Sequence, residues 1–223
     1  MAILIQGYSG VAMDVDGFTY RPMRVTIRPL DYGSLGQYRI STWEGGGTMA
    51  AGLAANSEIY QVRWVSTPQL AVVWGVQLDT FFSVGTGFTA GFANITLTIA
   101  RSWTVDGSGG ATANLTNNNM LRTSMPSSLM GAIRTSTGTA LTAGTKTLDA
   151  QPVGRLAFSV GTATYTQITG QLSLYGASSL EDGGNPAGLV LAQNEGLVMR
   201  ATVPATGVWG FSVGFAWSEV TAY

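Results

Sequence analysis

Pairs of carboxylates are the residues of this chain whose types and spacing come closest to a chemical site. They are Asp14 with Asp16 and Glu181 with Asp182. A glycosidase holds two carboxyl groups about 5 to 9.5 Å apart across a sugar, whereas neighbours on a turn point in different directions. The run from Asp14 to Gly17 also matches part of a calcium loop, but it lacks the third acidic position and the distal Glu. We therefore interpret both pairs as turn residues and expect no metal and no other cofactor.

Two residue types that serve most hydrolases are missing. The chain has no Cys and no His, which excludes Ser-His-Asp and Cys-His nucleophilic chemistry and removes the commonest transition-metal ligand. The glycines from Gly85 to Gly91 precede another predicted strand, so no helix N-terminus is available to a phosphate. The single Lys, Lys146, follows Thr145 where a P-loop requires Gly. We expect a protein that is not an enzyme.

The charge composition predicts a surface that partners cover. Only 10% of the 223 residues are charged, against about 25% in typical soluble domains, while 45% are hydrophobic. Such a surface resists self-association poorly. Ten Arg accompany the one Lys, and Arg is the cation preferred at protein interfaces, so we expect protein partners and no nucleic acid. The longest apolar run, Leu70 to Val76, is too short to cross a bilayer as a helix, and the first residues lack the basic region of a secretory signal. We therefore expect no membrane partner and synthesis in the cytoplasm.

A strict period of two runs through the segment near the end of the chain. Apolar residues take every second position, namely Trp209, Phe211, Val213, Phe215 and Trp217. Small uncharged residues take the positions between them, namely Gly210, Ser212, Gly214, Ala216 and Ser218. The aromatic face predicts core or subunit-interface positions, above all Trp209, Phe211, Phe215 and Trp217. We expect a second sheet or a neighbouring subunit to cover the small-residue face.

Similar alternation predicts strands along most of the chain. They are expected at Met23–Ile27, Gly36–Ser41, Tyr60–Val65, Leu70–Leu78, Thr80–Val84, Ile95–Ala100, Arg155–Val160, Ile168–Tyr175 and Leu189–Gln193. Turn residues at Asn194–Gly196 and Pro204–Gly207 predict that the last three strands form a meander. A short helix or an Ala-rich loop is expected at Thr48–Asn56, and one or two helical turns are expected at Pro126–Ile133. The Gly- and Asn-rich loop Val105–Asn119 is expected to protrude.

These elements predict one all-β domain over residues 1–223, with a β-sandwich or jelly-roll core at 21–223 and few short helices. Residues 1–20 are apolar but weakly bounded by turns, which favours an extended arm that docks on a neighbour by strand addition. The candidate contacts of this arm are Ile3, Ile5, Tyr8, Met13 and Phe18.

Four stretches carry a family resemblance. They are RPMRVTIRPLDYGSLGQYRIS (21–41), GTMAAGLAANSEIYQVRW (47–64), LRTSMPSSLMGAIRTSTGTALTAGTKTLDAQP (121–152) and VLAQNEGLVMRATVPATGVWGFSVGFAWSEV (190–220). Together they resemble small uncharacterised virion structural proteins of tailed bacteriophages. The resemblance implies a place in the virion and a structural role, and it supplies no active-site residues.

With the low charge, the resemblance favours a capsid decoration or cement protein that binds the major capsid protein or other virion proteins. We expect it to assemble with itself as a symmetric homo-oligomer, a trimer. One alternative is a tail or fibre component that contacts the host surface. Another is a carbohydrate-binding or carbohydrate-active β-sandwich that uses Trp43 with Glu181 and Asp182.

Overall fold

The computed structural model describes residues 5–6, 12–13, 35–43, 49–50, 53, 55–82, 89–116, 125–160, 172–176 and 188–221. The chain divides into two compact units, Met1–Leu30 and Asp31–Tyr223. In the first unit, β1 (Ile5–Gln6) pairs antiparallel with β2 (Ala12–Met13), which sets Ile5 opposite Met13. Three predicted arm contacts, Ile3, Tyr8 and Phe18, lie outside the described residues, as does the strand predicted at Met23–Ile27.

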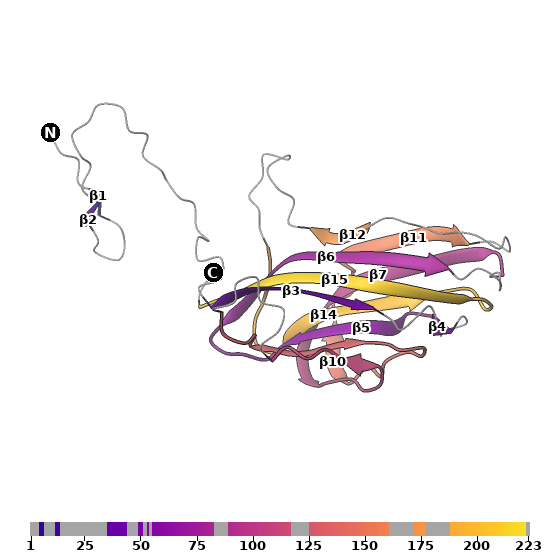
Figure 1. The fold of residues 1–223 in the computed structure, drawn as a ribbon, viewed down its shortest axis with the longest axis horizontal. Coiled ribbons are helices and arrows are strands. Elements are labelled where there is room, and N and C mark those ends of the chain that lie inside the picture. Colours follow the sequence, from indigo (N-terminus) through magenta and orange to yellow (C-terminus); the bar gives the residue numbers. More distant parts are fainter. Residues whose placement is uncertain are drawn as a thin grey trace, which may run out of the picture. The chain divides into compact units, whose positions relative to one another are not determined.

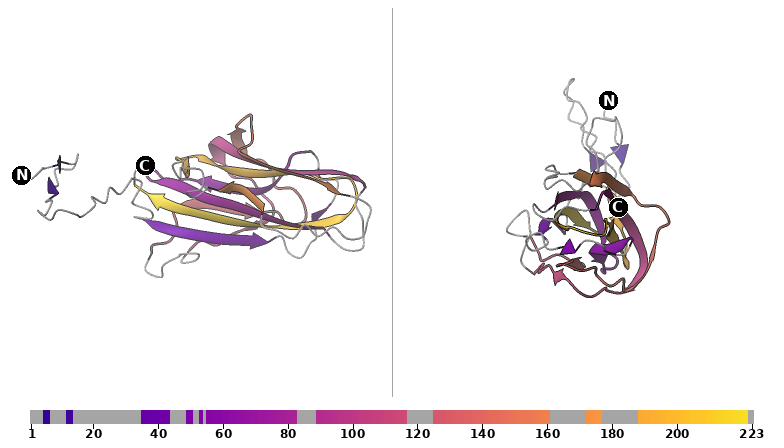
Figure 2. Two further views of the ribbon diagram at one scale, coloured as in Figure 1. Left: turned by 90° about the horizontal axis from the view of Figure 1, so that it is seen from above. Right: turned by 90° about the vertical axis from the view of Figure 1, so that its right-hand side faces the viewer.

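The second unit consists of two antiparallel sheets that pack face to face (Figures 1 and 2). One sheet has the order β12 (Leu172–Gly176), β6 (Leu70–Phe82), β15 (Val208–Val220) and β3 (Gly36–Trp43), with β13 (Leu189–Leu191) also on β6 and β4 (Met49–Ala50) on β15. The other has the order β10 (Thr145–Leu148), β7 (Gly91–Val105), β14 (Glu195–Thr202), β5 (Ser57–Trp64), β9 (Met130–Thr135) and β8 (Ala111–Thr112), with β11 (Gly154–Val160) also on β7. The predicted all-β sandwich is confirmed.

No helix occurs among the described residues, so the helical turns expected at Pro126–Ile133 are wrong, as is the helical alternative for Thr48–Asn56 wherever that segment is described. Met49 and Ala50 form β4, and the second predicted helix is replaced by β9, which begins at Met130. Met130 and Ile133 of β9 are buried in the core. The pairing of β9 with β5 outweighs the local helix-start signal of Pro126. None of the described residues belongs to a helix that is long and apolar enough to cross a membrane.

Aromatic side chains of β15 fill the centre of the sandwich. Trp209, Phe211, Phe215 and Trp217 are each 1% exposed or less. The Trp217 ring stacks between two neighbours, with ring centroids 5.3 Å from Tyr38 and 5.0 Å from Phe215. Apolar side chains of the other sheet belong to the same core, among them Ile95, Leu97, Leu197 and Met199. The period-two pattern of the last strand therefore lies with its aromatic face inward.

The predicted meander of the last three strands is wrong. β14 pairs with β5 and β7 in one sheet, whereas β13 and β15 each pair with β6 in the other sheet. The chain crosses from sheet to sheet on both sides of β14, at turns where Asn194 has φ 63° and Gly207 has φ 112°. Both strands turn an apolar face to the same core. Alternation alone therefore does not distinguish a neighbour in the sheet from a strand across the core.

Two further expectations need correction. The strand predicted at Thr80–Val84 continues β6, which runs unbroken from Leu70 to Phe82. Within the loop expected to protrude, residues 105–116 are described, and part of this segment packs onto the sandwich, although most of its residues are exposed. Ala111 and Thr112 pair with β9, and Gly107 and Leu115 are buried.

Candidate functional site

The side of β6, β15 and β3 that faces away from the core is the first candidate. We call it the outer sheet face and define it by eight residues. They are Arg39 and Ser41 on β3, Trp74, Gln77 and Asp79 on β6, and Ser212, Gly214 and Ala216 on β15. β15 lies in the middle, so each of its small residues has a neighbour on both sides. Gly214 stands opposite Ser41 and Gln77, and Ala216 stands opposite Arg39 and Gly75.

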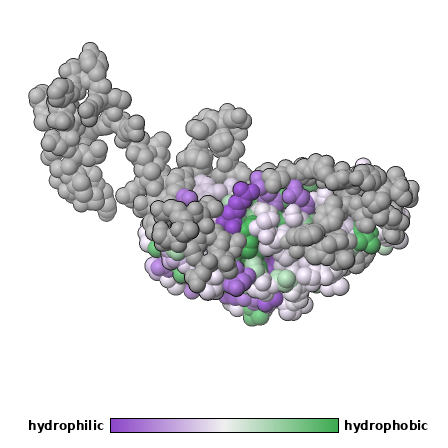
Figure 3. All heavy atoms as spheres, in the orientation of Figure 1, coloured by the Kyte–Doolittle hydropathy of each residue, from purple (hydrophilic) through white to green (hydrophobic). Residues whose placement is uncertain are grey.

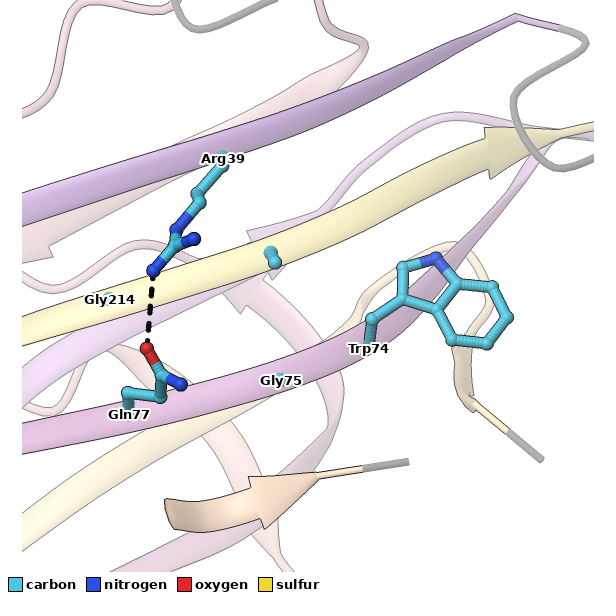
Figure 4. Close-up of a pocket in the computed structure, with 6 residues that line it drawn as sticks. Arg39, Trp74, Gly75, Gln77 and Gly214 are labelled. Atoms are coloured by element: carbon cyan, nitrogen blue, oxygen red, sulfur yellow. Dashed lines mark hydrogen bonds between the residues drawn. The ribbon is translucent and has the colours of Figure 1, made fainter. Parts of the chain in front are cut away.

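Side chains from the flanking strands lie across the small residues of β15. Arg39 Nη2 donates a hydrogen bond of 3.2 Å to Gln77 Oε1, and this bond spans β15 beside Gly214 (Figure 4). Ser212 Oγ donates to Asp79 Oδ2 at 3.3 Å. A row of bulky residues on β15 would stand in the way of these bridges, so the small side chains keep the face flat.

A hollow of about 140 Å³ opens on this face. Its lining consists of Arg39, Trp74, Gly75, Gln77, Gly214 and Ala216. The Arg39–Gln77 pair lies beside Gly214, and the indole of Trp74 lies farther along β6, beyond Gly75 (Figure 4). Trp74 Nε1 donates to Ser218 Oγ at 2.6 Å, which fixes the ring. The lining offers an aromatic surface, a guanidinium and an amide, which suit stacking and hydrogen bonding, and none of its described residues is a carboxylate that could do acid or base work.

The outer sheet face is close to electrically neutral. Its defining side chains include one cation, Arg39, and one anion, Asp79. In the view of Figure 3, pale spheres of intermediate hydropathy dominate among the described residues, with smaller purple and green patches between them. The expected cover by a second sheet is wrong, because the second sheet packs on the aromatic face. Ser212, Gly214 and Ala216 remain half-buried, and cover by a neighbouring subunit stays a prediction.

The structure does not gather the predicted site residues at this face. The four aromatics of β15 point into the core. The backbone of Trp43 ends β3, opposite Ser212, and the carboxylate pairs at 14/16 and 181/182 lie outside the described residues. Ile5 and Met13 belong to the other unit, where their backbones pair. No group of three potential metal ligands occurs in the described part of the chain.

A buried carboxylate that the sequence pattern does not indicate lies near the end of β15. Glu219 is 1% exposed and accepts hydrogen bonds from Ser128 Oγ (2.6 Å), Leu129 N (3.0 Å) and Trp217 Nε1 (3.1 Å). Burial raises the pKa of this carboxyl group above its usual value of 4.5, although the three donors oppose the shift. Burial, together with the charge of Glu219, also raises the pKa of Tyr38 to about 12. Glu219 joins β15 to the segment before β9.

A second buried polar group includes the only Lys of the chain. Lys146 Nζ donates to Glu58 Oε2 at 2.8 Å and lies 4.5 Å from the centre of the Trp103 ring. Gln61 Nε2 donates to the same Glu58 oxygen at 2.5 Å and to the carbonyl of Thr142 at 2.8 Å. The sequence singled out Lys146 only as a residue that does not fit the P-loop pattern. The chain has ten Arg and a single Lys, and this contrast is the one sequence signal that could have marked Lys146 as a special residue.

No protein-family model, curated protein or solved structure matches this chain.

Proposed function

We propose that this chain is a non-enzymatic structural protein of a bacteriophage virion, a capsid decoration protein that binds other copies of itself and the shell through the outer sheet face. The observation that carries the proposal is the flat, nearly neutral row of Ser212, Gly214 and Ala216 between the bridging side chains of β3 and β6. A partner surface approaches such a row closely and desolvates few charges, as in the centres of protein interfaces. The resemblance to phage virion proteins supports the particle as the setting.

Sparse charge supports assembly as the working state. With charged residues at 10% and a net charge of −1, the chain has little electrostatic repulsion between copies. Homo-oligomers of this kind close with cyclic symmetry, and a trimer is the state we propose. The first unit, with its β1–β2 pair, is the proposed second contact, through strand addition to a neighbour.

The experiment compares one substitution on the outer sheet face with one elsewhere. Ala216→Lys introduces a charge in the middle of the face, and Ser159→Lys introduces the same charge at an exposed position of β11. Size-exclusion chromatography with light scattering should give the wild type and Ser159→Lys at about three times the 23.3 kDa of the chain. Ala216→Lys should run as a folded monomer. If Ala216→Lys assembles like the wild type, the outer sheet face is not the contact.

Removal of residues 1–20 tests the second contact. The truncated chain should keep its far-ultraviolet circular dichroism spectrum and lose binding to purified particles that lack the protein. Normal binding by the truncated chain would remove the arm from the proposal. Copy number separates the capsid from the tail, because a shell protein is present at far more copies per particle than a tail or fibre component.

Glycan binding is a second candidate, favoured by the hollow beside Trp74. An indole next to a guanidinium and an amide can stack on a sugar ring and bond its hydroxyl groups. A glycan array gives the test. Binding that is lost in Trp74→Phe and in Arg39→Met, while the oligomeric state is kept, would support it. If no glycan on the array binds the protein, glycan binding is ruled out as its function.

A further inference from the structure

Three buried side chains from two distant strands meet at one oxygen atom. Glu58 and Gln61 lie on β5, and Lys146 lies on β10, which is separated from β5 in the sheet by β7 and β14. Glu58 Oε2 accepts hydrogen bonds from the amine of Lys146 at 2.8 Å and from the side-chain amide of Gln61 at 2.5 Å. A nucleophile, an electrophile and a proton acceptor are thus neighbours.

The surroundings close this group off from solvent. The Lys146 side chain is 2% exposed, that of Glu58 is 9% exposed, and Gln61 is 2% exposed. Backbone hydrogen bonds hold the segment before β10 over β5, from Ser136 N to Ile59 O at 2.9 Å and from Leu141 N to Glu58 O at 2.8 Å. Gly107 packs so tightly that an added Cβ would collide with the amide of Gln61.

The orientation of Gln61 leaves its carbonyl available. Both hydrogens of Nε2 are used, one on Glu58 Oε2 and one on the carbonyl of Thr142. Oε1 is buried and has no hydrogen-bond partner among the described residues. A buried amide oxygen without a partner is costly in a folded protein, and this one belongs to the side chain that shares Glu58 Oε2 with the Lys146 amine.

We propose that Lys146 and Gln61 form an intramolecular isopeptide bond, with Glu58 as the proton carrier. Glu58 first takes a proton from the Lys146 ammonium group, which leaves a neutral amine and a neutral carboxyl group. Glu58 Oε2 holds the amine and the amide on one oxygen atom, which supplies the high effective concentration that such a reaction needs.

The reaction balances without an added reagent. The Nζ lone pair attacks Cδ of Gln61, and a C–N bond forms. The Glu58 carboxyl group gives its proton to Nε2 and takes one from Nζ, so the old C–Nε2 bond breaks and ammonia leaves. Ammonia then removes the remaining proton from Glu58. One Lys ammonium and one Gln amide become one secondary amide and one ammonium ion, and the Glu58 carboxylate is restored.

Intact mass spectrometry of the full-length folded protein tests this proposal directly. The wild type should weigh about 17 Da less than its sequence, the mass of one ammonia. In a tryptic digest, residues 40–63 should be joined to residues 135–155, because trypsin does not cleave after an acylated Lys146. A wild-type mass equal to the sequence mass, with a free peptide that ends at Lys146, overturns the proposal without any variant.

Variants assign the roles. Glu58→Gln removes the proton carrier with little change in volume, and Lys146→Arg removes the nucleophile, so both should keep the mass of their own sequences. The matched control is Glu195→Gln, which removes another ion-paired carboxylate, the partner of Arg101, and should still lose about 17 Da. A full loss of ammonia in Glu58→Gln would overturn the role of Glu58. A joined peptide that contains Gln61 in Lys146→Arg would overturn the role of Lys146.

Discussion

Glu219 gives the sharpest test of how the C-terminal part of β15 is held. In Glu219→Ala, the Ser128 hydroxyl, the Leu129 amide and the Trp217 indole all lose their acceptor. Each buried donor without an acceptor costs about 1 to 3 kcal/mol. Burying the carboxylate itself costs free energy, as its raised pKa indicates. Removing the carboxylate recovers this cost and offsets part of the loss. We therefore expect the free energy of unfolding to fall by about 3 kcal/mol.

Glu219→Gln is the matched comparison. The amide oxygen can keep the acceptor position of Oε1, so this variant should lose about 1 kcal/mol or less. Urea unfolding followed by tryptophan fluorescence measures both, with an unchanged dependence on urea as the check that the same surface unfolds. If Glu219→Ala unfolds within about 1 kcal/mol of the wild type, the carboxylate does not hold the segment before β9 and the reasoning fails.

Three further predictions concern the same domain. Because the folded state keeps a proton on Glu219 at a higher pH than the unfolded state does, the wild-type free energy of unfolding should fall as pH rises above 4.5 and level off above the folded pKa, and Glu219→Gln should flatten this part of the curve. Trp217→Ala should cost about 3 to 5 kcal/mol in the same assay, and a loss below about 1 kcal/mol would contradict its place in the core. Gly110→Ala should cost about 1 to 3 kcal/mol, since Gly110 has φ +60° and a Cβ would collide with the carbonyl of Thr135. The control Gly214→Ala, whose Cβ would lie 3.6 Å from Gln77, should change stability by less than about 1 kcal/mol, and equal effects at the two glycines would refute the strain argument.

Alternation predicted which faces of the strands are buried. In β15 the period of two separates aromatic from small residues without exception between Trp209 and Ser218, and the structure turns the aromatic side inward. The same holds for Tyr60, Val62 and Trp64 on β5. Successive side chains of a strand point to opposite faces of the sheet, so the sequence alone predicts which residues share a face.

Strand pairing could not be predicted in the same way. β14 and β15 follow one another through a short turn, yet they lie in opposite sheets. Choosing between a hairpin and a crossing depends on how the turn at Pro204–Gly207 directs the chain and on which distant strand offers an open edge. For β15 these neighbours are β3 and β6, more than a hundred residues earlier, and no local pattern carries that information.

The buried polar groups were harder still to predict from the sequence. Lys146 lies in a Thr- and Gly-rich stretch that is typical of an exposed loop, and Glu58 is an ordinary acidic residue just before the strand predicted at Tyr60–Val65. Only the fold brings them together, because β10 and the segment before it return to β5 after more than eighty residues. The outer sheet face shows the intermediate case. Its small residues are evident in the sequence, whereas the bridge from Arg39 to Gln77 is not.

The central claim is that this chain works as a subunit of a virion. Quantitative mass spectrometry of purified particles of the virus that encodes it, together with particle imaging, tests that claim most directly. We predict on the order of hundreds of copies per particle, arranged symmetrically on the head. A dozen or fewer copies at the tail would contradict the decoration role, and absence of the protein from the particle would contradict the claim as a whole.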